Sequence, residues 1–157
     1  MKLPRTYPTP RRVVVTGMGA VAPNGIGVDA YCTALRNGTS GIGLISLFET
    51  DGLECQVAAE VKNFAAEDFF SLQDMRRVGR AAPLLIAATA EALGRARICW
   101  QHLNLEEKQS WGVVIGSGGG TTDFMEEQYR LYFTDRLRKV SAYNISSSTP
   151  GSLSSEI

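Results

Sequence analysis

The sequence predicts an α/β chain, because short apolar runs typical of strands alternate with longer segments patterned as helices. Residues 13–15 and 111–115 are apolar runs of the kind that form buried strands, and each leads directly into a glycine-rich loop. Between them, the alanine-rich stretch 79–96 has the composition of a helix packed against a sheet, with Pro83 in its first turn. A wholly parallel, doubly wound sheet is one arrangement that this order allows.

Shorter elements are expected between the two predicted strands. A helix should begin at Asp29, which can cap it, and should stop at Asn37 and Gly38. The remaining expectations are an extended stretch at residues 45–48, a strand at 55–60 and a short helical turn at 64–70.

The second glycine loop is followed by two more predicted helices. Either Thr122 or Asp123 can cap the first of them, with Glu126 at capping-box spacing from Asp123. The second is expected to begin at about Pro150 or Gly151. Because the sequence ends inside this helix on an apolar residue and without a cap, we expect the protein to continue past Ile157.

The composition narrows the class of protein. At 157 residues, with 44% hydrophobic and 20% charged side chains, the chain is typical of a globular rather than a disordered protein. The formal net charge is zero, so no overall field favours binding to nucleic acid or to a membrane surface. No apolar stretch approaches the ~20 residues of a membrane span. Residues 1–10 lack the apolar core of a signal peptide, so we expect a short N-terminal tail, a domain over residues 11–157 and a cytoplasmic location.

The cysteines suggest neither a disulfide framework nor a metal site. There are three, Cys32, Cys55 and Cys99, and no two lie at CxxC spacing. The single histidine, His102, supplies too few ligands to support a zinc site. None of the cysteines is predicted at the N-terminus of a helix, where a thiolate is stabilised, so no Cys/His catalytic pair is expected. Reduced thiols and no bound metal are therefore expected.

The two glycine loops carry the most specific local patterns. Residues 17–22 follow a predicted strand and fit G-x-G-x-x-A, the dinucleotide fingerprint, so a nucleotide-binding α/β domain is one alternative. That fingerprint requires a helix to begin at once, whereas residues 23–27 contain proline and two glycines. Residues 116–120 lack the Gly-Lys-Ser/Thr ending of a phosphate-binding loop. Their simpler interpretation is close approach of the backbone to another segment or to a ligand.

Taken in order, these and other motifs resemble the opening half of the β-ketoacyl-[acyl-carrier-protein] synthase family, elongating type, within the thiolase fold. The motifs that carry the resemblance lie at residues 13–19, 23–25, 35–38, 40–42, 48–64, 116–120, 138–141 and 148–150. They cover nearly the whole chain in order and without large gaps. The resemblance implies that the chain is the N-terminal half of a thiolase-like α/β fold, whose complete form is a five-layered αβαβα body that dimerises.

The resemblance also implies a reaction. The full protein would condense an acyl thioester with malonyl carried on acyl carrier protein, in fatty acid or polyketide biosynthesis. In this family a cysteine takes the acyl group and two histidines support decarboxylation, and the resemblance places all three beyond Ile157. No catalytic residue is therefore expected in this chain, and the fragment alone is expected to be inactive. No cofactor is implied, because phosphopantetheine arrives on the carrier protein.

Two site roles concern the acyl tunnel of the family. Gly118 and Gly119 would line it, and Gly119 stands where many members that elongate saturated chains carry a branched residue. A glycine there would leave room for a longer, or polyketide-like, acyl chain, the alternative being a tight turn and nothing more. Asn144 and Ile145 would lie on the stretch that reaches across the dimer towards the partner's tunnel, unless they form ordinary interface packing.

The third role is docking of acyl carrier protein, which is strongly acidic and would be steered by basic patches. Two basic clusters are present, one of Arg76, Arg77 and Arg80 and one of Arg136, Arg138 and Lys139. The resemblance aligns Arg76 and Arg77 with the carrier-docking helix of the family. We name Arg76, Arg77, Arg136 and Lys139 as docking candidates. The alternative is that these are solvated surface charges.

Two further alternatives stay open. Chain-length-factor proteins share the architecture, lack the nucleophilic cysteine and act as partners of a synthase, so the full protein would form either a homodimer or a heterodimer with a related subunit. A short protein that serves only for dimerisation or binding is the other. If the chain is expressed alone, we expect poor solubility, because sheet edge and helix surface meant for the other half would be exposed.

Overall fold

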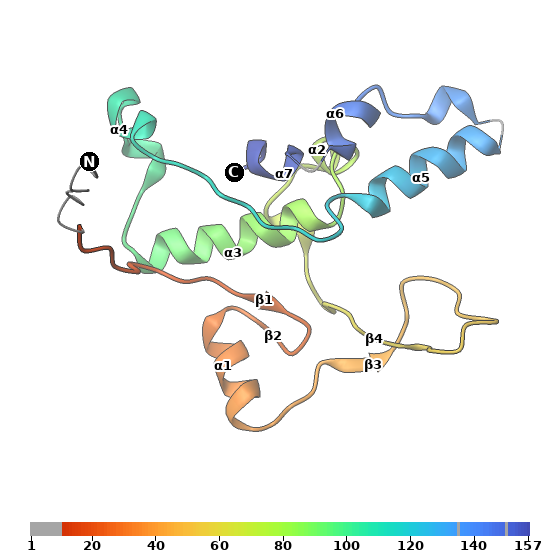
Figure 1. Ribbon diagram of the computed structural model, residues 1–157, viewed down its shortest axis with the longest axis horizontal. Coiled ribbons are helices and arrows are strands. Elements are labelled where there is room, and N and C mark those ends of the chain that lie inside the picture. Colours follow the sequence, from red (N-terminus) through yellow and green to blue (C-terminus); the bar gives the residue numbers. More distant parts are fainter. Residues whose placement is uncertain (1–10, 135, 150) are drawn as a thin grey trace, which may run out of the picture.

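Helix α3, Ala81–Arg95, is the longest helix, and most other elements are arranged around it (Figure 1). The structure is a computed structural model that describes residues 11–134, 136–149 and 151–157. Pro83 lies in the first turn of α3, where a missing N–H breaks no helical hydrogen bond, and Ala82, Pro83 and Ala87 are buried. The helix predicted over residues 79–96 is therefore confirmed.

The N-terminal segment packs closely against α3. A Cβ atom on Gly17 would overlap the carbonyl oxygen of Ala92, and one on Gly19 would overlap the carbonyl oxygen of Ala88. Ala88 and Ala92 are one helical turn apart, so the two glycines match two successive turns of the helix. The G-x-G pattern is thus explained by backbone packing on a helix.

A small hairpin and a helix follow this segment. Strand β1 (Val21–Ala22) pairs antiparallel with β2 (Gly25–Ile26), and α1 (Val28–Arg36) begins directly after it. The predicted end of α1 is confirmed, because Asn37 is its C-cap and Gly38 has a φ of 65°. The predicted cap is wrong: Gly27 is the N-cap, and Asp29 lies in the first turn, where it forms a 2.8 Å salt bridge with Arg95 of α3.

A second hairpin pairs β3 (Ile42–Leu44) antiparallel with β4 (Val57–Ala59), in the register Leu44↔Val57. Strand β4 confirms the strand predicted within residues 55–60. Glu60 ends this hairpin, and its buried carboxylate accepts hydrogen bonds from the backbone N–H groups of Ser46 and Leu47. Both sheets of the described residues are two-stranded and antiparallel, so the wholly parallel sheet is not formed there.

The two firmest strand predictions are wrong for this structure. Residues 13–15 and 111–115 are not assigned as strands, and Val13 and Val114 are 90% and 96% exposed. A strand is stabilised by hydrogen bonds to a neighbouring strand, and neither segment is paired within the part of the chain that the structure describes. The apolar, β-branched sequence of these two segments is therefore not enough to form a strand when no partner strand is present.

Short helices connect the hairpins to α3 and lead away from it. They are η1 (Ala66–Asp68), α2 (Leu72–Met75), η2 (Trp100–His102) and α4 (Leu105–Gln109). Element η1 confirms the helical turn predicted at residues 64–70. Helix α4 was not predicted, although Asn104 and Glu107 form a capping box at its start.

The C-terminal part contains α5 (Thr122–Phe133), η3 (Leu137–Lys139), α6 (Asn144–Ser148) and α7 (Ser152–Ser155). The predicted caps of α5 are wrong: its N-cap is Thr121, which makes no side-chain cap, and Asp123 accepts instead from the backbone N–H of Arg80 at 2.7 Å. Asp123 therefore caps α3. Of the two predicted starts of the last helix, Pro150 lies outside the described residues, and Gly151 is confirmed as the N-cap of α7.

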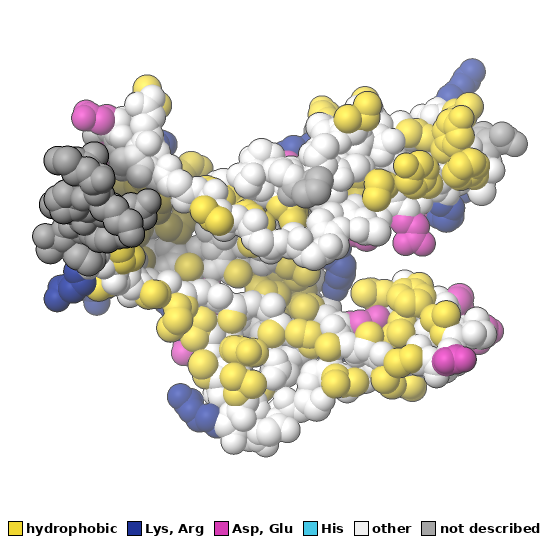
Figure 2. Space-filling view, in the orientation of Figure 1, with side chains coloured by type: hydrophobic (Ala, Val, Ile, Leu, Met, Phe, Trp, Pro, Cys, Tyr) yellow, Lys and Arg dark blue, Asp and Glu magenta, His cyan; other side chains and the backbone are white. Residues whose placement is uncertain are grey.

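The buried core is small and lies where α3, α7 and the segment before α2 meet. It contains Phe70, Ala82 and Leu153, with Ile115 packed against it. Large apolar side chains are exposed over both hairpins and over α5 (Figure 2). None of the described helices is both long and apolar enough to cross a membrane.

Candidate functional site

The second glycine loop connects residues 111–115 to α5 and leaves open space beside two of its glycines. A Cβ on Gly118 would meet no atom within 4 Å, and one on Gly119 would meet only the Thr122 hydroxyl oxygen, at 3.9 Å. Gly120, with a φ of 57°, is the loop residue whose conformation requires glycine. The Ser117 hydroxyl accepts a 2.8 Å hydrogen bond from the Gly120 N–H and closes the turn. The loop thus has room for larger side chains at both tunnel candidates.

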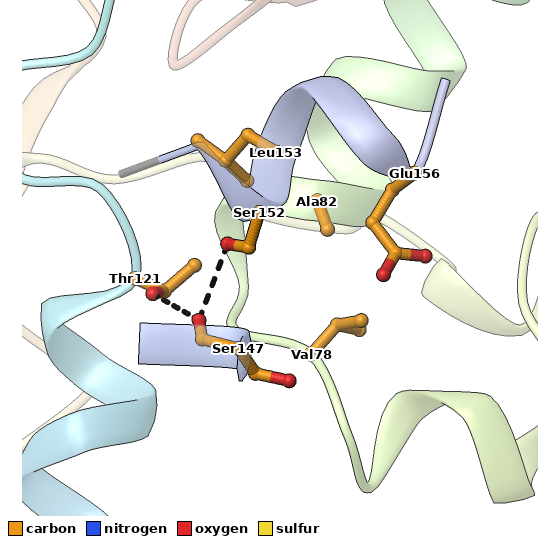
Figure 3. A pocket seen from close by; sticks show the side chains of 7 residues that line it. All are labelled: Val78, Ala82, Thr121, Ser147, Ser152, Leu153 and Glu156. Atoms are coloured by element: carbon orange, nitrogen blue, oxygen red, sulfur yellow. Dashed lines mark hydrogen bonds between the residues drawn. The ribbon is translucent and has the colours of Figure 1, made fainter. Parts of the chain in front are cut away.

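The end of this loop is joined to α6 and α7 at one carbonyl group. The hydroxyl of Thr121, which is buried, donates to the carbonyl oxygen of Ser147 at 2.5 Å, and the hydroxyl of Ser152 donates to the same oxygen at 3.2 Å (Figure 3). The loop end, α6 and α7 therefore share one acceptor, and Thr121 lies 26 positions and Ser152 five positions from Ser147 in the sequence. A displacement of α7 would disturb both α6 and the loop end.

A small cavity lies beside this junction (Figure 3). It encloses about 10 Å³, about the space that one water centre occupies. Its lining residues are Val78, Ala82, Thr121, Ser147, Ser152, Leu153 and Glu156. The cavity is far too small for an acyl chain.

The two tunnel candidates on α6 differ in burial. Asn144 is half-buried, and its side-chain oxygen accepts a 3.3 Å hydrogen bond from the Ser148 hydroxyl. Ile145 is 83% exposed. Further exposed aromatic side chains occur in α5 and at the α6 N-cap: Tyr129, Tyr132, Phe133 and Tyr143. The structure therefore exposes the Ile145 side chain and holds the Asn144 side chain against its own helix.

The docking candidates of the first basic cluster have different surroundings. Arg76 is exposed and forms no salt bridge within the described ranges. Arg77 donates to Asp74 at 3.0 Å and to both carboxylate oxygens of Glu156, at 3.0 and 3.3 Å. These carboxylates raise the pKa of Arg77, the Asp74 hydrogen bond contributing most. Arg80 donates to the backbone carbonyl of Val61 at 2.6 Å.

The second basic cluster lies around η3. Arg136, Arg138 and Lys139 are all exposed, and among the residues described no salt bridge involves any of them. Three cations on one short, exposed turn form a local positive patch on a chain of zero net charge.

The geometry of the first glycine loop argues against nucleotide binding. The carboxylate of Glu91 in α3 accepts hydrogen bonds from the backbone N–H of Val28 at 2.9 Å and of Ala20 at 3.0 Å. The N-terminal amide of α1 that a pyrophosphate would need is therefore already bound to a carboxylate of the protein. A hairpin, β1–β2, also separates the glycines from α1.

The thiols and the histidine do not come together as a site. Cys32 lies within α1, Cys55 is exposed before β4, and Cys99 directly precedes η2. The Cys99 thiol donates to the side-chain oxygen of Gln101 at 3.4 Å. His102 ends the same short turn, and no hydrogen bond joins it to a thiol in the described structure. No cluster of potential metal ligands occurs in the part of the chain that the structure describes.

Comparison with protein families gives a match over almost the whole chain. Residues 10–157 match the model of the beta-ketoacyl synthase N-terminal domain. The 3-oxoacyl-[acyl-carrier-protein] synthase 2 of Synechocystis is 35% identical over 121 residues, which cover 77% of this chain and 28% of that relative. The corresponding protein of Vibrio cholerae is 36% identical over 137 residues, which cover 87% and 32%. The chain thus spans about a third or less of the length of the curated relatives that it matches.

Two solved structures share the fold. A structure of the ishigamide ketosynthase/chain length factor superposes with a TM-score of 0.73 at 24% identity, over 91% of this chain and 35% of that one. A structure of the AntDE–AntF assembly, a type II polyketide acyl-carrier protein in complex with its ketosynthase, superposes with a TM-score of 0.70 at 18% identity, over 91% and 37%. The predicted α/β, thiolase-like fold is confirmed.

Proposed function

The chain belongs to the beta-ketoacyl synthase family, as its N-terminal domain, and on this premise we propose that the full protein is a 3-oxoacyl-[acyl-carrier-protein] synthase. The observation that carries the proposal is the family match over residues 10–157, together with relatives of that name at 35% and 36% identity. The protein is thereby an acyltransferase of fatty acid or polyketide synthesis.

The reaction is a decarboxylative Claisen condensation. A thiolate of the enzyme takes the acyl group from a thioester, which releases the donor thiol. Malonyl on the carrier protein loses CO₂, and the resulting carbanion attacks the enzyme-bound thioester carbonyl. The carbon–sulfur bond to the enzyme then breaks, and the 3-oxoacyl chain remains on the carrier. Backbone N–H groups can stabilise the developing oxyanion by hydrogen bonds. We assign neither the nucleophilic cysteine nor the two histidines to residues 1–157.

This part of the protein contributes tunnel wall and docking surface in the proposal. Gly118 and Gly119 leave space beside the loop, and Ile145 offers apolar surface that a second subunit would cover. Arg76, Arg136 and Lys139 are exposed cations suited to an acidic carrier protein. We propose further that the full protein works in the cytoplasm, as a dimer, without a resident cofactor.

The test is a condensation assay with the purified full-length protein. Acyl- and malonyl-loaded carrier proteins are supplied, and carrier-bound products are identified by mass spectrometry. A 3-oxoacyl product supports the proposal. Reversing the charges of Arg136 and Lys139 to Glu should weaken carrier binding most at low salt, because exposed charges are screened as ionic strength rises.

A chain length factor is the second candidate, and the likeness to the ishigamide ketosynthase/chain length factor assembly favours it. In that case the full protein would form no condensation product by itself, and it would alter the length of the products when mixed with an active synthase of the same genome. A synthase would instead be active by itself.

A further inference from the structure

The side chains of Arg77 and Glu156 form an ion pair that joins the segment directly after α2 to the C-terminal end of α7. The residues are 79 positions apart in sequence, and two parallel N–H···O bonds of 3.0 and 3.3 Å connect the guanidinium to the carboxylate. The Glu156 side chain is only 15% exposed. A two-point pair of this kind fixes orientation as well as distance.

The neighbouring Arg76 provides the contrast. It carries the same charge one residue away, is exposed, and has no salt-bridge partner in the described structure. Arg77 is partly buried and has its guanidinium engaged by Asp74 and Glu156. The charge of Arg77 is already compensated by two carboxylates, so Arg77 should attract an acidic partner less strongly than Arg76 does.

The ion pair acts on the junction behind the glycine loop. Glu156 directly follows α7, whose Ser152 hydroxyl binds the Ser147 carbonyl, and the same carbonyl accepts from Thr121 at the loop end (Figure 3). Leu153 of α7 is buried against Ala82 of α3 in the core cluster. The position of α7 therefore sets the positions of α6 and of the loop that carries Gly119.

We propose that Arg77 and Glu156 are positioning residues for acyl-chain length and that, of the adjacent pair, Arg76 alone is a docking residue for the carrier protein. The ion pair holds α7, and α7 holds the residues beside the acyl chain: Gly119 through Thr121, and Asn144 and Ile145 through Ser147. This inference rests on the proposed function, because chain length is a property of the condensation.

Four variants of the full-length protein separate the two roles. Arg77→Lys keeps the positive charge but cannot form the two-point pair, and Glu156→Gln removes the negative partner. The exchange Arg77→Glu/Glu156→Arg restores a pair of opposite polarity, and Arg76→Gln is the matched control. The readouts are the KM for acyl carrier protein and the distribution of product chain lengths.

For Arg76→Gln we expect a KM for carrier protein raised about threefold and an unchanged product distribution. Arg77→Lys and Glu156→Gln should broaden the product distribution with a KM within about twofold of the parent, and the exchange should bring the distribution back towards the parent. An Arg77→Lys distribution identical to the parent overturns the proposal. So does a lower KM in Glu156→Gln, which would mean that Glu156 masks a docking arginine.

Hydrogen exchange keeps the inference testable if the parent protein forms no product and the proposed function fails. Amides of residues 144–155 should exchange faster in Arg77→Lys and Glu156→Gln than in the parent, and at the parental rate in Arg76→Gln. Equal exchange in all variants would show that the ion pair positions nothing.

Discussion

The carboxylate of Glu91, in α3, accepts a 2.9 Å hydrogen bond from the backbone N–H of Val28, the first residue of α1. It also accepts from the N–H of Ala20 and from the Arg95 guanidinium, which in turn binds Asp29. The N-cap of α1 is Gly27, which has no side chain to offer, so a residue of another helix supplies the missing acceptor. The long helix and the N-terminal hairpin are joined at this point.

Removal of this carboxylate should destabilise the protein. Glu91→Ala leaves the N–H groups of Val28 and Ala20 without their acceptor, and we expect the free energy of unfolding to fall by about 1–2 kcal/mol. Urea titration of the full-length protein measures it. Glu126→Ala, at an exposed position of α5, is the control and should change stability by less than about 0.5 kcal/mol. Equal effects at both positions would contradict the capping role.

The contribution of Glu91 should also depend on pH. Partial burial acts to raise the pKa of this carboxyl, but the hydrogen bonds from Val28, Ala20 and Arg95 outweigh it and hold the pKa below its ordinary value of 4.5. A carboxyl with a lowered folded-state pKa stabilises the protein above its ordinary pKa, and this contribution is lost as pH falls through the folded-state pKa. Unfolding curves of the parent and of Glu91→Gln should therefore differ at neutral pH and converge in acid. A difference independent of pH would refute the linkage.

The same substitution at two glycines should have opposite effects. Gly19→Ala places a methyl group on the Ala88 carbonyl of α3 and should cost about 3 kcal/mol of stability. Gly94→Ala lies within α3, where a Cβ meets no atom within 4 Å, and should stabilise the helix by about 0.5–1 kcal/mol. The change in stability of both variants is measured by thermal unfolding. A Gly19→Ala variant as stable as the parent would mean that the N-terminal segment does not pack on α3 as described.

Substitution at the second glycine loop should change the product instead of the stability. Gly119 has open space around its Cβ position and no positive φ, so Gly119→Ile fits the loop backbone. The branched side chain would fill space beside the acyl chain, and products of the full-length protein should become shorter. Gly94→Ile, remote from the loop in sequence and exposed, is the matched control. An unchanged chain-length distribution in Gly119→Ile would rule out a tunnel role for this position.

The sequence correctly predicted the elements that depend on neighbouring residues alone. Helix α3 follows from its alanine content, and the end of α1 follows from Asn37 and Gly38. The strands at 13–15 and 111–115 were wrong because a strand needs a partner, and sequence periodicity does not reveal whether one is present. The cap of α5 was wrong because Asp123 binds Arg80, 43 positions earlier in the chain, in preference to its own helix.

In the candidate site, too, features that depend on neighbouring residues were predicted and contacts between distant residues were not. The structure leaves open space beside Gly118 and Gly119, and their role in lining the acyl tunnel stays a prediction. The Arg77–Glu156 pair and the shared Ser147 carbonyl were not predicted, because each joins residues that only the folded chain brings together. Glu156 carries no motif, and only its burial next to an arginine marks it.

The synthase assignment is tested most directly by the mass of the carrier-bound acyl chain. This is measured after the purified full-length protein, without other synthase subunits, has acted on acyl- and malonyl-carrier protein. We expect a chain extended by one unreduced two-carbon unit, with one CO₂ released for each malonyl consumed. Carrier proteins recovered with their original acyl and malonyl groups, from a protein shown to be folded, would contradict the assignment as a synthase.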